Sequence, residues 1–316
     1  MIWIAVDAMG GDNAPRHVVD GALAAAHDVD LGVVLVGPTA RLNDELQRHS
    51  GVETNRIRLV DAPDVIAMDE APAATLRRKP AASIRAAVQT VARGEAAGLF
   101  SAGHTGATVI AAHAAFGMLT AVDRPALAAT IPTPGGRAAL LDVGANVECR
   151  PQHLVQFAVM GSVYARVALG IATPRIGLLS TGEEATKGNE LTRESHRLLK
   201  SSLPSFIGNV EARDVYRGHA DVIDCDGFTG NVALKISEVL IDVIEGLLNR
   251  ELSVLTDYAQ YGGAPLLGVN GVAIVGHGRS SAKAVRNGVV MAHRFASDGI
   301  LQRIQGEIAA FAVPHQ

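Results

Sequence analysis

The sequence has few aromatic residues, few cysteines and no surplus of positive charge, and these shortages exclude several classes of protein. Aromatic side chains make up 4% of the 316 residues, which argues against a base-stacking surface for single-stranded nucleic acid. A formal net charge of −4 gives no counterion-release term for binding to phosphate backbones. Cys149 and Cys225 lie far apart with no CxxC motif, as is usual for buried thiols in a reducing cytoplasm. We therefore expect a cytoplasmic protein that does not bind nucleic acid.

Long apolar runs and the common catalytic motifs are also missing. No stretch of about 18 apolar residues is present, so no segment is expected to span a bilayer. Asp7 interrupts the N-terminal apolar run too early for a secretion signal. The sequence contains neither HExxH, nor a G-x-S-x-G elbow, nor a Walker lysine loop, nor the dinucleotide glycine fingerprint. We expect no metal site, no cofactor and no nucleophilic triad.

Short apolar runs alternate along the chain with patterns of helical period. We expect strands at Ile2–Val6, Leu31–Val36, Ile57–Val60, Gly98–Ser101, Leu127–Ile131, Ala138–Val143, Arg175–Leu179, Phe206–Val210, Ala220–Cys225 and Val272–Val275. Helices are expected between them, among others at Val18–His27, Ser83–Arg93, Gln152–Leu169 and Leu191–Ser201. This alternation predicts an α/β fold with a doubly wound, mainly parallel sheet and helices on both faces. The prolines and glycines of residues 132–136 predict one antiparallel excursion.

Glycine and small polar residues follow six of the expected strands, beginning with the run Asp7-Ala8-Met9-Gly10-Gly11-Asp12. Ligands of such sheets bind beyond the carboxyl ends of the strands, so we expect the six turns to form one anion-binding site. The candidate binding residues are Asp7, Gly10, Gly11, Asp12, Ser101, Gly103, His104, Thr105, Gly106, Asn146, Asp226 and Ser280. The candidate catalytic residues are Lys187, Asn231 and His277.

Several of these residues also have a structural interpretation. Thr105 alone would cap the helix expected over Ala107–Phe116. His277 would satisfy loop carbonyls, and Lys187 would pair with neighbouring glutamates on the surface. Asn231 would cap the helix expected from Val232. The recurrence of the same chemistry in six turns favours the functional interpretation.

A basic patch at Arg77, Arg78 and Lys79 stands out in a mildly acidic chain. Such a run is usually a solvated surface. The alternative is a docking site for an acidic protein partner.

The six polar turns and further motifs of the chain resemble the phosphate acyltransferase (PlsX) family, and the resemblance extends nearly from end to end. The motifs that carry the resemblance are Asp7–Asp12 with Pro15, Ser101–Gly106, Val122–Ala126, Leu141–Asn146, His153–Tyr164, Gly182–Glu190, Phe206–Asp214, Asp226–Lys235, Tyr261–Gly271 and His277-Gly278. The resemblance implies that inorganic phosphate attacks the thioester of a long-chain acyl carrier protein and yields an acyl phosphate for phospholipid synthesis. It also implies a homodimer with a fold similar to isocitrate and isopropylmalate dehydrogenases.

The resemblance suggests a role for each candidate residue. The helix N-terminal amides at Gly103–Gly106 and Ser280–Ser281 would hold phosphate. Lys187 or Asn231 would stabilise the oxyanion, and His277 would assist the departing thiol. Arg77, Arg78 and Lys79 would dock the carrier protein. Two alternatives stay open, namely an NAD-dependent hydroxy-acid dehydrogenase of the same fold superfamily and a non-catalytic scaffold of lipid synthesis.

The sequence departs from the family pattern at two places that bear on function. His104 stands where members usually carry Asn, which adds a titratable group to that turn. The helical arm around residues 229–260 is short and has few lysines, so it gives only weak support for the membrane association suggested for the family. No linker or repeat divides the chain, and we expect one domain over residues 1–316.

Overall fold

The computed structural model describes residues 1–49, 54–248 and 260–311. Their contacts divide the chain into two compact units, each described here by itself. Unit 1 comprises Met1–Gly117 and Tyr258–Gly299, and unit 2 comprises Met118–Asp257 and Ile300–Gln316. The expectation of a single domain over 1–316 stays a prediction.

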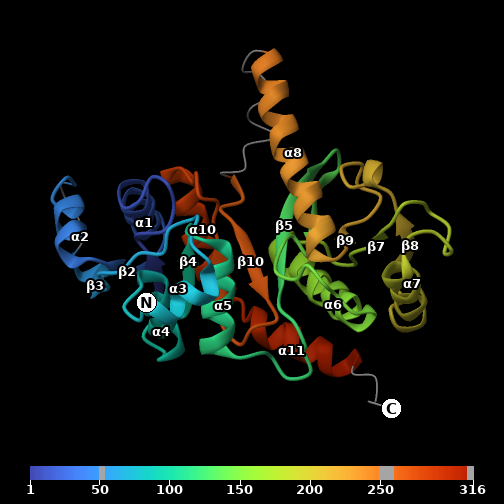
Figure 1. The fold of residues 1–316 in the computed structure, drawn as a ribbon, viewed down its shortest axis with the longest axis horizontal. Helices are drawn as coiled ribbons and strands as arrows, with labels where there is room; N and C mark the ends of the chain where they lie inside the picture. The colour runs from blue at the N-terminus through green and yellow to red at the C-terminus, as the bar shows by residue number, and fades with distance from the viewer. Residues whose placement is uncertain (50–53, 249–259, 312–316) are drawn as a thin grey trace. The chain divides into compact units, whose positions relative to one another are not determined.

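Unit 1 is built on a sheet with the strand order β3-β2-β1-β4-β11-β10. Its strands are β1 (Ile2–Asp7), β2 (Leu31–Gly37), β3 (Ile57–Asp61), β4 (Gly98–Ser101), β10 (Ala264–Leu267) and β11 (Val272–Val275). Its helices are α1 (Arg16–Asp28), α2 (Thr39–Leu46), α3 (Pro72–Arg78), α4 (Ser83–Ala92), α5 (Thr105–Phe116) and α10 (Ala282–Ser297), with a 3-10 turn at Thr54–Arg56. All neighbours in this sheet pair in parallel except β10 with β11. Figure 1 shows α1 with α10 on one side of the sheet and α3, α4 and α5 on the other.

Unit 2 has the strand order β5-β6-β9-β7-β8. Its strands are β5 (Ala126–Thr133), β6 (Gly136–Leu141), β7 (Ile176–Leu179), β8 (Phe206–Val210) and β9 (Val222–Asp224). Its helices are α6 (Pro151–Ala168), α7 (Glu190–Ser202), α8 (Gly227–Leu248) and α11 (Ile300–Phe311), with a 3-10 turn, η2, at Ala212–Asp214. Strands β6, β9, β7 and β8 are parallel, so their carboxyl ends lie at one edge of this sheet.

The cores explain why these segments form strands and helices. All seven residues of β2 are buried, as expected for a parallel strand with helices on both faces. In unit 2, α6 is buried over most of its length and packs on β6 and β9, where Gly161 faces Val222 and Leu141. The fully buried Tyr164 satisfies its hydroxyl with Thr130 at 2.5 Å.

The predicted mainly parallel α/β fold is confirmed, and all ten expected strands are present within a few residues. The expected antiparallel excursion is the β5–β6 hairpin. One strand, β10, was not predicted, because it is only four residues long and contains Pro265. The prediction that a helix begins at Val232 was wrong by five residues. This helix, α8, begins at Gly227, because Asp226 receives hydrogen bonds from the first turn.

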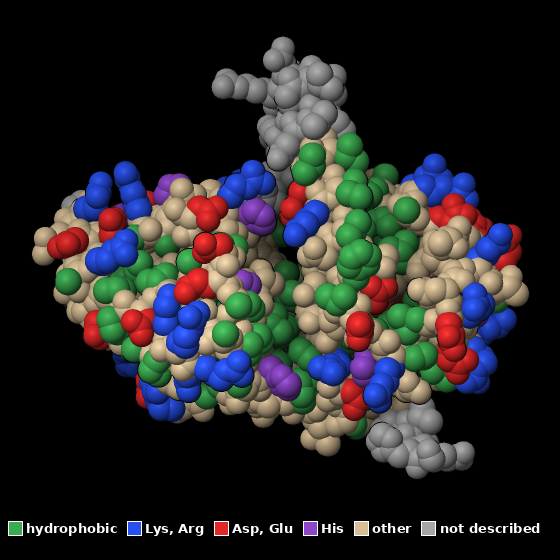
Figure 2. All heavy atoms as spheres, viewed as in Figure 1, with side chains coloured by type: hydrophobic (Ala, Val, Ile, Leu, Met, Phe, Trp, Pro, Cys, Tyr) green, Lys and Arg blue, Asp and Glu red, His purple; other side chains and the backbone are tan. Residues whose placement is uncertain are grey.

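The expected arm around residues 229–260 corresponds in part to α8, and residues 249–259 lie outside the described chain. Apolar side chains at Val232, Ile236, Val239 and Leu240 are exposed on α8. Figure 2 shows this apolar surface following the helix. Among the described residues, no helix has both the length and the apolar character needed to cross a membrane.

Candidate functional site

A buried hydrogen bond joins the ends of β1 and β4 in unit 1. The Ser101 hydroxyl donates to Asp7 Oδ2 at 2.8 Å and accepts the Gly103 N–H at 3.2 Å. The other carboxylate oxygen of Asp7 accepts the Met9 N–H at 3.3 Å. Burial raises the pKa of Asp7, and hydrogen bonds from Ser83, Ser101 and Met9 oppose that rise. Asp7 is only 2% exposed and Ser101 is fully enclosed, so both side chains hold the turns in place, and their predicted role in binding stays a prediction.

The paired glycines after β1 allow the neighbouring turns to approach at backbone distance. A Cβ built on Gly10 would lie 2.6 Å from the Gly103 nitrogen and 2.9 Å from Asp7 Oδ2. Gly11 has φ +102° and lies against the Gly278 carbonyl. The same carbonyl accepts the Asp12 N–H at 2.7 Å. The turns at residues 7–12, 101–106 and 277–281 are therefore brought together, as predicted for these three.

Helix α5 begins at the turn after β4 without a side-chain cap. His104 and not Thr105 occupies the N-cap position, and its side chain makes no capping bond. The N–H groups of Thr105, Gly106 and Ala107 donate to no acceptor within the described chain, because the first bond of this helix runs from Thr108 to the His104 carbonyl. His104 Nδ1 is enclosed and has no partner in the same part of the chain. Three free amides at the positive end of a helix are suitable donors to an anion, and anion binding at this turn stays a prediction.

The turn after β11 orients His277. Its Nδ1 accepts the Arg279 N–H at 3.1 Å, so the neutral ring carries its proton on Nε2. The Ser280 N–H donates to the His277 carbonyl, which leaves Ser280 buried beneath the turn. Ser281 caps α10 through the Ala284 N–H. His277 itself is exposed.

The basic patch is only partly available to a partner. The Lys79 ammonium binds Glu70 and the Val65 carbonyl, both at 2.7 Å. Arg78 is exposed and donates to Thr75 Oγ1. Arg77 is exposed, and its guanidinium makes no contact within the described residues. Arg77 and Arg78 thus carry the accessible charge of the patch.

In unit 2, a single buried carboxylate organises the turn that follows β6. Asp142 accepts five N–H bonds, from the Leu127, Gly144, Ala145 and Asn146 backbones and from the Asn146 side chain. Burial raises the pKa of Asp142, and these donors oppose the rise. The Asn146 amide also donates to the Pro125 carbonyl at 2.6 Å. Asn146, predicted as a binding residue, therefore has its amide N–H groups engaged in the fold.

The turn before α8 interlocks with this carboxylate turn. Asp226 accepts the N–H and hydroxyl of Thr229 at 2.9 and 2.7 Å, so its carboxylate serves as the helix cap. The Gly227 N–H donates to the Asn146 carbonyl. Asn231 lies inside the first turns of α8, where its Nδ2 donates to the Val143 carbonyl at 3.0 Å. One Nδ2 hydrogen and the Oδ1 atom of Asn231 remain available for a ligand.

Lys187 lies on the loop between β7 and α7, which we call the Lys187 loop (residues 180–189). Its N–H donates to the Glu184 carbonyl at 3.0 Å. The side chain is exposed, and its ammonium has no hydrogen bond or ion pair within the described chain. The expected pairing with neighbouring glutamates is therefore absent from this part of the chain. Glu183 instead binds Arg213, and Asn189 caps α7 through the Thr192 N–H.

The six predicted turns divide equally between the two units. Unit 2 brings together the turns at 142–146 and 226–231, with the Lys187 loop at the same sheet edge. The expectation that all six form one site stays a prediction.

Comparison with known proteins gives the chain its family. The family described as "Fatty acid synthesis protein" matches residues 2–255 and 249–303. A phosphate acyltransferase of Geobacter sulfurreducens is 46% identical over 95% of this chain and 92% of its own length. This protein belongs to that family.

Solved structures agree with the fold described above. A phosphotransacetylase from Streptococcus pyogenes has a TM-score of 0.70 at 18% identity, over 94% of each chain. A 4-hydroxythreonine-4-phosphate dehydrogenase from Klebsiella pneumoniae has a TM-score of 0.57 at 14% identity, over 93% of this chain and 99% of its own. The expected relation to the dehydrogenase fold is thereby confirmed at the level of architecture.

The sequence pattern does not single out two buried carboxyl groups, those of Asp142 and Asp224. Asp142 accepts the hydrogen bonds that close its turn. It begins an Asp-x-Gly pattern at the end of a strand, and this pattern is a sequence signal for such a turn. Asp224 is fully buried, and burial raises its pKa well above the usual value, with only the Cys225 backbone N–H acting in the opposite direction. Burial also raises the pKa of Cys149 to about 12, which keeps this thiol protonated and unreactive.

No three His, Cys, Asp or Glu side chains in the described part of the chain are grouped to hold a metal ion. The expectations of no metal and no cofactor stay predictions.

Proposed function

We propose that this protein transfers a long-chain acyl group from the thioester of an acyl carrier protein to inorganic phosphate, giving an acyl phosphate for phospholipid synthesis. Its family and its 46% identity to a phosphate acyltransferase support acyl transfer to phosphate. The observation that carries the proposal is the uncapped N-terminus of α5, whose three free amide N–H groups directly follow the turn that Gly10 and Gly11 approach at Ala102 and Gly103. This arrangement suits a phosphate ion.

The reaction needs no enzyme nucleophile, because a phosphate oxygen attacks the thioester carbonyl directly. The carbonyl oxygen becomes an oxyanion, the C–S bond then breaks, and the thiolate takes up a proton. We assign stabilisation of the oxyanion to Lys187, because its ammonium has no hydrogen bond or ion pair in the described chain. Asn231 is the alternative, with one amide hydrogen left after its bond to Val143. His277 would donate its Nε2 proton to the leaving sulfur, because Nδ1 accepts the Arg279 N–H.

The proposal includes two protein partners. Arg77 and Arg78 would dock the acidic carrier protein, while Lys79 is held by Glu70. A second copy of the chain would form a homodimer, which the exposed apolar side chains of α8 support. A cytoplasmic location is also part of the proposal, and the free thiols of Cys149 and Cys225 are in keeping with it. The short arm leaves membrane association weakly supported.

The test is direct trapping of the product. The protein is incubated with palmitoyl-acyl carrier protein and phosphate, and acyl phosphate is captured with hydroxylamine as the hydroxamate. Product that requires phosphate and exceeds a heat-inactivated control supports the proposal. No product beside an active reference enzyme refutes it, and carrier-protein binding without turnover would favour a scaffold. NAD binding measured by calorimetry would favour the dehydrogenase alternative.

A further inference from the structure

A buried asparagine at the end of β8 contacts the Lys187 loop. Asn209 is 8% exposed, and its Nδ2 donates to the Glu184 carbonyl at 2.9 Å. The Lys187 N–H donates to the same oxygen at 3.0 Å. The atom that closes the backbone turn at Lys187 is therefore held from the neighbouring strand. Because both N–H groups share the Glu184 carbonyl, a displacement of Asn209 would shift the backbone at Lys187.

His196 on α7 fixes the orientation of this asparagine. Its Nδ1 lies 2.9 Å from Asn209 Oδ1, and His196 is itself buried. Because Asn209 Nδ2 donates to Glu184, Oδ1 is the atom that must accept, so the proton lies on His196 Nδ1. The ring is held edge-on against Phe206, with centroids 5.2 Å apart. The amide is thus locked at both ends, and reversing it would break both bonds.

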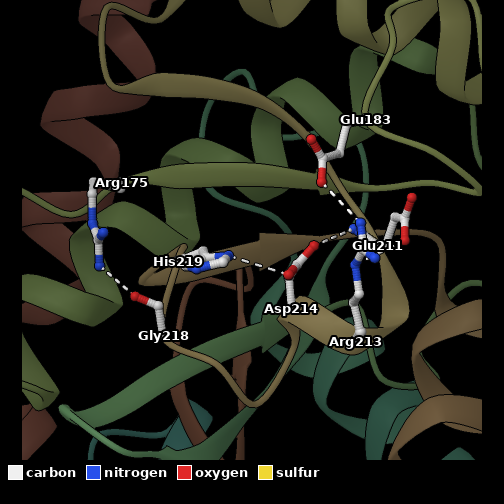
Figure 3. A network of polar contacts seen from close by, with 7 residues as sticks. All are labelled: Arg175, Glu183, Glu211, Arg213, Asp214, Gly218 and His219. Atoms are coloured by element: carbon white, nitrogen blue, oxygen red, sulfur yellow. Dashed lines mark hydrogen bonds and ion pairs between the residues drawn. The ribbon is translucent and has the colours of Figure 1, made fainter.

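The same loop has a second, exposed contact. Arg213 binds Glu183 Oε1 at 3.1 Å and Glu211 at 3.1 Å, and Figure 3 shows this network continuing through Asp214 to His219. Both partners of the Arg213–Glu183 pair are more than half exposed. Exposed ion pairs contribute little to stability because solvent screens them. The buried bond from Asn209 to the Glu184 carbonyl is therefore the stronger restraint on the Lys187 loop. Arg213, which lies on η2 and contacts the same loop, offers a matched control.

We propose that Asn209, oriented by His196, is a positioning residue that sets the place of Lys187 for catalysis. This inference rests on the proposed function, in which the Lys187 ammonium stabilises the oxyanion. Asn209 touches no substrate and acts through the Glu184 carbonyl. Stabilisation of an oxyanion depends steeply on donor position, so a loosened turn lowers kcat more than it raises KM.

The test combines kinetics with a double-mutant cycle in the full-length protein. Asn209→Ala should lower kcat about 10-fold with KM for the acyl donor within about 2-fold. In a Lys187→Ala background the same change should alter kcat less than about 2-fold, because the group that it positions is gone. Arg213→Ala, which removes the exposed contact, should stay within about 2-fold of wild type.

Two further measurements separate positioning from general damage. Hydrogen exchange at the Lys187 amide should accelerate in Asn209→Ala but not in Arg213→Ala. His196→Asn, whose amide nitrogen can replace Nδ1 as donor, should retain most activity, whereas His196→Leu should behave like Asn209→Ala.

The outcomes distinguish the two proposals. A wild-type protein that makes no acyl phosphate overturns the proposed function and this inference with it. If wild type is active, equal losses from Asn209→Ala with and without Lys187 show a structural role and overturn the positioning inference alone. Unchanged exchange at the Lys187 amide overturns it as well.

Discussion

The Ser101 hydroxyl donates a hydrogen bond to Asp7 Oδ2, with 2.8 Å between the two oxygens, and this bond connects the carboxyl end of β4 to that of β1. The same hydroxyl accepts the Gly103 N–H, so it links the buried carboxylate to the turn that starts α5. A carboxyl group enclosed near the sheet edge thereby fixes the place where helix amides meet solvent.

Replacing Ser101 with Ala should destabilise the protein by about 1–3 kcal/mol, because Asp7 and the Gly103 amide each lose a buried partner. The displaced turn should also raise KM for phosphate more than KM for the acyl donor. Urea denaturation and initial rates at varied phosphate measure the two effects. A stable variant with unchanged phosphate dependence would contradict the assignment of this turn to phosphate.

Gly10→Ala should lower the free energy of unfolding by about 1–3 kcal/mol, since the new Cβ would lie 2.6 Å from the Gly103 nitrogen. Gly306→Ala is the matched control. It lies in α11 with no atom within 4 Å of a new Cβ, and should stabilise the protein by about 0.5–1 kcal/mol. Thermal or urea unfolding of both variants tests this pair, and equal effects of the two changes would exclude steric contact as the cause.

Asp12→Asn should reduce turnover while leaving folding intact. The Asp12 N–H keeps its 2.7 Å bond to the Gly278 carbonyl, and its exposed carboxylate has no partner in the described chain. The change removes charge without disturbing the backbone, so any loss of kcat reports an electrostatic role. An inactive variant that also melts at lower temperature would show that the carboxylate is structural.

The strands and most turns could be predicted because their causes are local. Short apolar runs such as Gly98–Ser101 and Val272–Val275 match the observed strands residue for residue. β10 could not be predicted, since a four-residue strand that contains a proline leaves no periodic pattern. The start of α8 was placed too late because Gly227 and Gly230 suggested a loop, whereas contact with the Asp142 turn favours helix there.

Side-chain roles were harder to predict than the turns that carry them. Asp7, Asn146 and Asp226 have the residue types of ligand contacts, yet hydrogen bonds within the fold engage their side chains. Asn209 lies within the family-like motif Phe206–Asp214, but its role could not be predicted, because its partners His196 and Glu184 lie 13 and 25 residues away in sequence. Only the packing of α7 and the Lys187 loop against β8 reveals the connection.

His277→Asn should lower kcat on the order of 10²-fold or more while the fold is kept. The Asn side chain can still accept the Arg279 N–H, but nothing replaces the donor at Nε2. An acyl thioester of an acidic aromatic thiol should restore the rate, because that leaving group departs without a proton. Equal losses with both thioesters would assign His277 a role other than assisting the thiol.

Asp224→Asn should stabilise the protein, and the gain should grow with pH. Burial and the charges of Asp142 and Asp226 raise the pKa of Asp224 well above its usual value. The folded state then binds this proton more tightly than the unfolded chain. Stability is therefore full below the ordinary pKa of about 4 and falls as pH rises through the folded-state pKa.

Urea unfolding between about pH 5 and pH 8 measures that gain, since Asn stays neutral throughout. Asp221→Asn is the control of opposite sign. Desolvation raises the pKa of Asp221, but hydrogen bonds from Arg175 outweigh it and leave the pKa below its usual value. This variant should lose stability at neutral pH and approach wild type as pH falls through the folded-state pKa. A loss of stability in Asp224→Asn that is constant with pH would show that the carboxyl is held by a bond that Asn cannot make.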